Sequence, residues 1–280
     1  IGVAQIELND LLEIDNSTEL LRPNSQKLPN VIRNAISKAA NLNLSLFLLP
    51  ELSGDVILED TLQLAANEYN MVIIGGSYYN SGRINCCPIA IPGESKPYIV
   101  QKINPSPYEL SPNKNEGAIG GKDIFVFQNT EVGSFGVLIC NDFLEDQLLD
   151  EMLNYDLDYL CVISMNNDSD RFFEVMNSKC DNSASGIYIL YSNCLFSTSG
   201  ITTDGQSSIF GMMNRVFLKK LNKDEEYKYK YKLASFSSQN EEGILVAKIN
   251  LEERRPKFTN HLTKPNVSDI EKITFNSEGE

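Results

Sequence analysis

The sequence contains a single histidine, has no long apolar run and carries no excess of basic residues. No apolar stretch approaches the roughly 20 residues that a helix needs to cross a bilayer, and no basic segment followed by an apolar one marks a signal peptide. The formal net charge of −14 argues against binding of nucleic acids or anionic membranes by this domain. We therefore expect a globular protein of the cytoplasm.

The cysteines show neither the spacing of a zinc site nor the density of a disulfide framework. The six are Cys86, Cys87, Cys140, Cys161, Cys180 and Cys194. Several lie in apolar, strand-like runs, and two adjacent cysteines cannot easily chelate one ion together. We therefore expect reduced thiols, with the adjacent pair packed in a strand.

With 280 residues and 42% hydrophobic composition, the chain is long enough for one large α/β domain or two small ones. Apolar residues at helical spacing predict helices over 28–40 and 59–70. Strand-like runs at 2–6, 44–49 and 71–78 alternate with these helices. This β-α-β-α-β order predicts parallel neighbouring strands joined by right-handed crossovers.

Further along, two strand-like runs flank a Pro-Gly turn and predict a hairpin over 85–91 and 97–103. Beyond it, apolar runs predict strands over 133–139, 159–164, 187–193, 207–210 and 216–221. Both halves of the chain thus read as α/β, with a mixture of parallel and antiparallel pairs.

The segment 136–143 is the most informative stretch, because an apolar strand runs into a sharp turn at Cys140. Apolar residues at helical spacing then predict a helix over 144–153. Free amides at the start of a helix favour a thiolate, which is the nucleophilic form of cysteine. A buried structural cysteine is the alternative interpretation, since most free cysteines are of that kind.

A cysteine nucleophile needs a proton acceptor, and the usual partner is histidine. The single histidine, His261, lies in a polar tail that is a poor place for a catalytic dyad. A carboxylate or a lysine must then move the proton. Glu51 follows a buried-type strand, while Lys102 ends another strand and precedes Glu109 on a proline-braced loop.

The order and spacing of these residues resemble the nitrilase superfamily of carbon–nitrogen hydrolases. The resemblance rests on the Pro-Glu at Glu51, on Lys102 followed by Glu109, and on the Gly-x-Leu-Ile-Cys-x-Asp segment around Cys140. It continues through 158–164, 184–193, 205–211 and 241–250. We therefore predict a nitrilase-like domain over residues 1–258 and a polar tail or subunit-contact extension over 259–280.

The resemblance implies a four-layer α-β-β-α sandwich of two mixed sheets with outer helices. It also implies that Glu51 is the general base and acid, and that Cys140 forms a thioester acyl-enzyme. Lys102 and the backbone amide of Asn141 are expected to stabilise the oxyanion, while Glu109 holds Lys102 or positions the incoming nucleophile. No metal or organic cofactor is implied.

Substrate contacts are expected from Asn166 and Asn167 at the end of the predicted strand 159–164, and from Tyr108. Helix capping is the plain alternative for the asparagines, because a helix is predicted to follow them. Asp142 keeps the acid that resembles amidases, whereas the nitrile-hydrolysing members have Trp-Glu after the cysteine. An amide is therefore the expected small-molecule substrate.

Two alternatives remain beside an amidase. An N-acyltransferase would use the same residues with an amine in place of water. A nitrilase-like assembly or ligand-sensing module of a larger protein would have lost its chemistry or kept it as a secondary role. The chain starts inside a strand-like run at Ile1, so we also expect that it is processed, or cut from a longer polypeptide with a fused domain. Separately, we expect a homo-oligomer.

Overall fold

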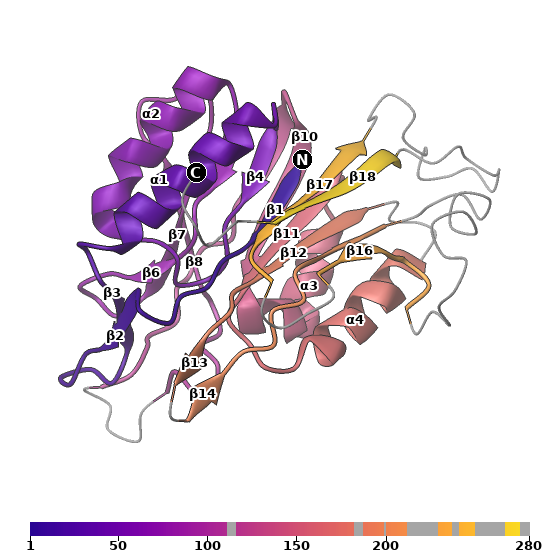
Figure 1. The fold of residues 1–280 in the computed structure, drawn as a ribbon. Coiled ribbons are helices and arrows are strands. Elements are labelled where there is room, and N and C mark those ends of the chain that lie inside the picture. The colour runs from indigo at the N-terminus through magenta and orange to yellow at the C-terminus, as the bar shows by residue number, and fades with distance from the viewer. Residues whose placement is uncertain are drawn as a thin grey trace.

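Two β-sheets pack face to face between two layers of helices (Figure 1). The computed structural model describes residues 1–110, 116–181, 187–198, 200–211, 229–236, 241–249 and 267–274. Helices α1 and α2 lie on the outer side of one sheet, and α3 and α4 lie on the outer side of the other. This arrangement confirms the predicted four-layer sandwich.

The first sheet contains eight strands within these ranges, in the order β18-β17-β1-β4-β5-β7-β6, with β8 paired to β7. Strands β1, β4 and β5 are parallel, and the other pairs are antiparallel. The bounds are β1 Gly2–Gln5, β4 Leu46–Leu48, β5 Val72–Ile74, β6 Tyr78–Tyr79, β7 Asn85–Ala90, β8 Tyr98–Gln101, β17 Gly243–Ile249 and β18 Val267–Thr274.

The second sheet contains six strands among the described residues, in the order β16-β15-β12-β11-β10-β9. Its central strands β10, β11 and β12 are parallel, with Ile139 opposite Ile163 in the β10–β11 pair. The bounds are β9 Val126–Thr130, β10 Gly133–Ile139, β11 Tyr159–Ser164, β12 Tyr188–Asn193, β15 Ser208–Phe210 and β16 Lys232–Ser235.

The helices cover the outer faces of the sheets, and short ribbons extend beyond the strand ends. The helices are α1 Leu28–Asn41, α2 Glu59–Tyr69, α3 Asp146–Leu153 and α4 Ser169–Asp181, with 3₁₀ turns η1 Val56–Leu58 and η2 Cys140–Leu144. Two-stranded ribbons pair β2 Leu12–Ile14 with β3 Leu21–Pro23, and β13 Ser197–Thr198 with β14 Ile201–Thr202. No helix within the described ranges is long and apolar enough to cross a membrane.

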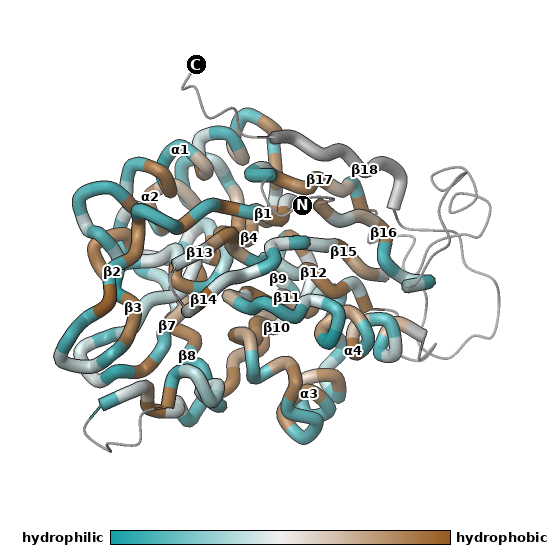
Figure 2. The backbone as a smooth tube through the Cα atoms, turned by 60° about the horizontal axis from the view of Figure 1, so that its bottom comes forward, coloured by the Kyte–Doolittle hydropathy of each residue, from teal (hydrophilic) through white to brown (hydrophobic). Residues whose placement is uncertain are grey.

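Strand β4 shows why the inner strands are apolar on both sides. Leu46 and Leu48 belong to the core between the two sheets, whereas Phe47 belongs to the core beneath α1 and α2. Side chains alternate between the faces of a strand, so a strand covered on both faces must be apolar throughout. Along α1 and α4 in Figure 2, hydrophobic and hydrophilic segments alternate, as expected for helices with one face on a sheet.

Hydrogen bonds also join the two sheets, from β1 in the first sheet to β12 and to the residue before β15 in the second. The Ser192 hydroxyl donates to the Ala4 carbonyl at 2.7 Å, and the Ser207 amide donates to Gln5 Oε1 at 2.8 Å. All four residues are buried, where an unpaired polar group costs free energy. These bonds therefore fix how the sheets are placed relative to each other.

The predicted helices over 28–40 and 59–70 and the 85–103 hairpin are confirmed as α1, α2 and the β7–β8 pair. Strand β18 was not predicted, although it pairs along almost all of β17. It lies beyond residue 258, in the stretch predicted as a polar tail. The predicted strand 216–221 and His261 lie outside the described residues.

Glycine 54 lies in the turn that follows Glu51, where a side chain has no room. A Cβ atom there would lie 2.3 Å from the Gly76 carbonyl oxygen. We therefore expect Gly54→Ala to lower the free energy of unfolding by about 1–3 kcal/mol, measured by urea denaturation. Gly82→Ala is the control, because its Cβ would meet only Asn80 Oδ1 at 3.3 Å. Equal stabilities for the two variants would contradict this packing.

Candidate active site

Three strands end at one edge of the sandwich and carry the candidate site. Glu51 follows β4, Lys102 is the first residue after β8, and Cys140 is the first residue after β10. They are only 3%, 1% and 7% exposed, respectively. The Cys140 thiol and the Glu51 carboxyl lie close enough for each to shift the pKa of the other, so the second sheet meets the first at this point. The structure thus brings together residues that are far apart in the sequence.

The Lys102 ammonium lies between two carboxylates. Its Nζ donates to Glu51 Oε1 at 2.9 Å and to Glu109 Oε2 at 2.6 Å. Burial acts to lower the pKa of Lys102, but the attraction of both carboxylates outweighs it and raises that pKa well above its ordinary value. An ammonium group this deeply buried needs such partners, because an uncompensated charge costs several kcal/mol. Lys102 is therefore a fixed positive charge.

Both oxygens of Glu51 accept hydrogen bonds beyond the one from Lys102. Asn85 Nδ2 donates to Oε1 at 2.8 Å, and the Met165 amide donates to Oε2 at 2.8 Å. Burial raises the pKa of Glu51, and Glu109 adds to this shift while Lys102 opposes it. The predicted sheltered carboxylate is thus present, and a raised pKa suits a group that must both accept and return a proton.

Glu109 is held in its ionised form. Burial opposes ionisation, but Lys102 outweighs it and lowers the pKa of this carboxyl. The Tyr79 hydroxyl donates to Oε1 and the Ser106 amide donates to Oε2, both at 2.6 Å. The two glutamates beside Lys102 therefore differ in pKa, and a pair of acids separated in this way can take different roles.

Cys140 adopts the left-handed backbone conformation, with φ of 51°. Non-glycine residues rarely do so, and such strain is concentrated at functional sites. The 3₁₀ turn η2 starts at this residue, which confirms the predicted sharp turn.

The predicted preference for the thiolate is wrong. Helix α3 begins only at Asp146, whereas helix-dipole effects fall off within one turn. Burial and then the Glu51 charge raise the pKa of Cys140 to about 12, with Lys102 opposing the shift. In this environment the neutral thiol is favoured over the thiolate.

Asp142 connects the cysteine turn to the lysine loop. Its carboxylate accepts from the Ile103 amide at 3.1 Å and from the Asn104 amide at 2.7 Å. Asn141 Nδ2 adds a bond to the Asn104 carbonyl at 3.3 Å. The residues after Cys140 therefore hold the residues after Lys102 in place.

The residues predicted to contact substrate lie in different surroundings. Tyr108 is 91% exposed, and Asn167 is also exposed. Asn166 is half-buried, and its carboxamide bonds with Ser164, Tyr191 and the Asp168 amide. Asp168 in turn accepts from the Arg171 amide at 3.3 Å, in the manner of a helix cap. Substrate binding by these residues stays a prediction.

Three polar residues of the site were missed in the sequence. Asn85 holds Glu51 and Tyr79 holds Glu109, as described above, while Ser164 lies beside Cys140 and acts to lower the pKa of its thiol. Each lies in or at the end of a short strand. A polar side chain at a buried strand position was the available signal, because such groups need a partner.

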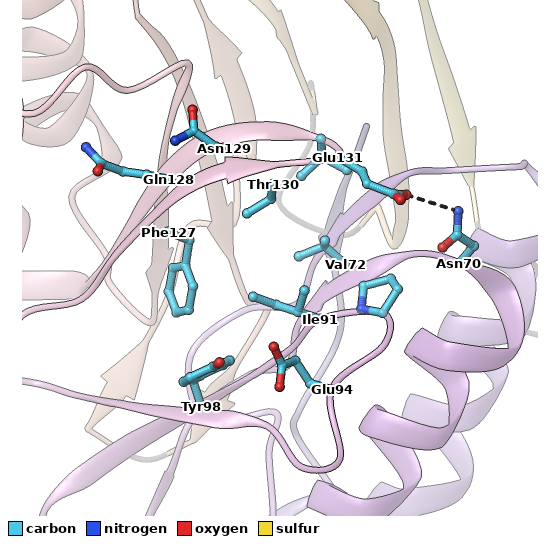
Figure 3. A pocket seen from close by; sticks show the side chains of 12 residues that line it. Asn70, Val72, Ile91, Glu94, Tyr98, Phe127, Gln128, Asn129, Thr130 and Glu131 are labelled. Atoms are coloured by element: carbon cyan, nitrogen blue, oxygen red, sulfur yellow. Dashed lines mark hydrogen bonds between the residues drawn. The ribbon is translucent and has the colours of Figure 1, made fainter.

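A separate pocket of about 380 Å³ lies at the opposite ends of the strands (Figure 3). Its lining includes Val72 at the start of β5, Tyr98 at the start of β8, and residues 129–132, which form the end of β9 and the turn into β10. None of the predicted site residues lines it. Within the described ranges, no group of three or more His, Cys, Asp or Glu side chains could hold a metal ion.

Asp142 generates a prediction about pH. Burial raises its pKa to about 7, against the opposing effects of the Asn104 amide and Lys102, whereas an unperturbed aspartate titrates near 4. Between these values the folded protein keeps a proton that the unfolded chain loses, so this residue's contribution to stability falls as the pH rises. We expect the free energy of unfolding of Asp142→Asn, relative to wild type, to rise by up to ~4 kcal/mol from pH 4 to pH 7.

Urea denaturation at several pH values measures this difference. Asp146→Asn is the matched control, because that carboxylate is exposed in the same segment. A difference between Asp142→Asn and wild type that stays constant across the window would contradict the raised pKa.

The chain is similar to known proteins in its structure, but no similarity was found in comparisons of its sequence. No family model and no curated protein sequence matches the chain. An amidase of the nitrilase superfamily from Nesterenkonia sp. AN1 has a TM-score of 0.62 at 14% identity, over 87% of each chain. A mutant of that amidase with the acetamide moiety of fluoroacetamide on its active-site cysteine gives 0.63 at 13% identity, again over 87% of each chain.

A glutamine-dependent NAD+ synthetase from Acinetobacter baumannii is also similar, with a TM-score of 0.61 at 15% identity. The alignment covers 88% of this chain and 44% of the synthetase. The fold implied by the sequence motifs is therefore confirmed by solved structures. The chain has the fold of the nitrilase superfamily.

Proposed function

We propose that this protein hydrolyses a carbon–nitrogen bond of a small amide through a thioester at Cys140. The observation that carries the proposal is the buried Lys102, held between Glu51 and Glu109 next to the sulfur. A fixed cation, a carboxylate with a raised pKa and a thiol are the groups that acyl transfer requires.

In the first half of the reaction, Glu51 removes the thiol proton as the Cys140 sulfur attacks the amide carbonyl carbon. The carbonyl oxygen becomes an oxyanion, which Lys102 Nζ and the Asn141 backbone amide stabilise. Each donor of this kind contributes about 3–4 kcal/mol in the transition state. Glu51 then passes its proton to the nitrogen, the C–N bond breaks, and the amine leaves an acyl thioester.

In the second half, Glu51 removes a proton from water as its oxygen attacks the thioester. A second oxyanion forms at the same donors. The C–S bond breaks, and Glu51 returns the proton to the sulfur of Cys140. The product is a carboxylic acid, and the residues return to their starting protonation states.

The two glutamates have different surroundings and therefore different roles: Glu51 transfers protons, and Glu109 holds Lys102. The raised pKa of Glu51, caused first by burial, suits a group that accepts a proton and returns it. The lowered pKa of Glu109 keeps it ionised and holds Lys102 in position. Paired acids with different pKa values serve such separate roles in other hydrolases.

The similar proteins guide the choice of substrates. The Nesterenkonia relative carries an acetamide adduct on its cysteine, and the synthetase is glutamine-dependent. A panel should therefore include short aliphatic amides and glutamine. Added hydroxylamine or a primary amine shows whether an amine can replace water, as in an N-acyltransferase.

Cys140→Ser tests the nucleophile. An alcohol in place of the thiol gives Glu51 a much weaker acid to deprotonate, so we expect kcat/KM for the best amide to fall by at least about 10³-fold. Ammonia release measures it. Cys180→Ser is the matched control, because that buried cysteine in α4 bonds only to the Ile187 carbonyl among the described residues. Equal losses in both variants would contradict the role of Cys140.

Glu51→Gln tests the proton carrier. The amide keeps the shape and can still accept from Lys102, but it cannot take the thiol proton. We expect kcat to fall by about 10²–10⁴-fold, which is the usual contribution of a general base. Glu145→Gln, an exposed acid near the same turn, should keep full activity. Retained activity in Glu51→Gln would reject the mechanism.

A further inference from the structure

A chain of buried hydrogen bonds leads from the start of α4 to the candidate nucleophile. Asn166 is its central member, and its carboxamide can be oriented in one way only. Oδ1 accepts from the Asp168 amide at 2.8 Å. Its Nδ2 must then supply both of its protons on the other side, where it donates to Ser164 Oγ at 2.8 Å and to the Tyr191 hydroxyl oxygen.

The far end of the chain fixes the remaining directions. The Ser169 hydroxyl donates to Asp204 Oδ1 at 2.6 Å, because a carboxylate can only accept. The Tyr191 hydroxyl, 3.2 Å from Ser169 Oγ, must then be the donor of that pair. Its oxygen is left to accept from Asn166, in agreement with the orientation of the carboxamide. Ser164, Ser169 and Tyr191 are fully buried, where water cannot substitute for these bonds.

These directions determine what the Ser164 hydroxyl can do. Its oxygen accepts from Asn166, so its own proton is free to be donated. Strands β10 and β11 are parallel with Ile139 opposite Ile163. The residues that follow this pair, Cys140 just past β10 and Ser164 at the end of β11, are therefore neighbours as well. The Ser164 side chain acts to lower the pKa of the thiol, opposite to the effect of burial.

We propose that Ser164 donates its hydroxyl proton to the Cys140 sulfur, and that Asn166 is the positioning residue that turns the hydroxyl toward it. The inference rests on the proposed function, and it adds one group that touches the reacting sulfur. As Glu51 takes the thiol proton, the negative charge that develops on sulfur is stabilised by the Ser164 O–H. The bond weakens when the thioester forms, and it strengthens again when the sulfur departs.

This proposal differs from a purely structural role. A structural chain would only hold the Met165–Asp168 turn against α4, and its loss would lower stability without changing the sulfur. The test is therefore the rate and pH dependence of Cys140 alkylation by iodoacetamide, followed by peptide mass spectrometry. Charged or titratable groups that act on or face Cys140 are Glu51, Lys102, Glu109, Tyr191 and Cys194, and all of them are unchanged in the variants.

Ser164→Ala removes the donor. We expect alkylation of Cys140 at pH 8 to slow by about tenfold or more, which is typical for a lost hydrogen bond to a charged group. The midpoint of the pH dependence of this alkylation should move upward by about one pH unit. Ser208→Ala is the matched control, because it removes another buried hydroxyl, bonded to the Gln206 carbonyl at 2.6 Å, and should leave the rate within about twofold of wild type.

Asn166→Asp reverses the direction of the bond. A carboxylate cannot donate, so the Ser164 hydroxyl would donate to it and turn away from the sulfur. Asn166→Asp should slow alkylation as much as Ser164→Ala, and the double variant should be no slower than Ser164→Ala alone. Additive losses would show instead that the new charge acts directly on the sulfur, and would overturn the role of Asn166.

A wild-type alkylation rate in folded Ser164→Ala would overturn the proposal outright. Thermal melts of each variant establish folding before labelling. Alkylation needs no amide substrate, so the result is separate from the proposed hydrolysis. If no amide is turned over but Ser164→Ala still slows alkylation, the hydrogen bond is supported and the hydrolase function fails.

Discussion

The buried ion contact of Lys102 with Glu51 and Glu109 is the interaction on which the rest of the site depends. Removing an ammonium group from water costs several kcal/mol, and only close, well-placed carboxylates recover it. With two acids and one base, the cluster has one negative charge more than it can balance. Burial raises the pKa of Glu51, and the charge of Glu109 adds to that shift while Lys102 opposes it. The surroundings of the cluster thus separate the pKa values of its two carboxyl groups.

The two sheets of the sandwich bring Glu51, Lys102 and Cys140 together at one edge. Parallel strands in each sheet end at the same edge, and the first sheet supplies Glu51 and Lys102 while the second supplies Cys140. Bonds from Ser192 and Ser207 to β1 set the placement of the sheets. Asp142 then ties the cysteine turn to the lysine loop. The proposed mechanism requires positioning to within a fraction of an ångström, and contacts between the sheets supply it.

Sequence patterns were sufficient to predict the helices and strands whose apolar residues form an unbroken run or stripe. The apolar run at Leu46–Leu48 predicted a strand covered on both faces, and the stripe beneath α1 predicted its helix. Strand β18, Val267–Thr274, escaped prediction because it lies in a stretch that is polar as a whole, and its pairing with β17 joins segments that the sequence does not link. The grouping of Glu51, Lys102 and Cys140 depended on a resemblance in motif order, since spacing alone cannot show that the ends of separate strands meet.

The pKa of Cys140 could not be predicted from the sequence, because it depends on burial and on the Glu51 charge brought from the other sheet. Asn85 and Ser164 were missed for the same reason, as their partners are distant in the chain. The most direct test mixes the protein with excess amide, quenches it in acid within one turnover, and maps the peptides by mass. We expect an acyl group on Cys140 that hydroxylamine removes. An amide that is hydrolysed with no acyl group on that cysteine at any quench time, including in the presence of a slowly hydrolysed analogue, would contradict the thioester mechanism.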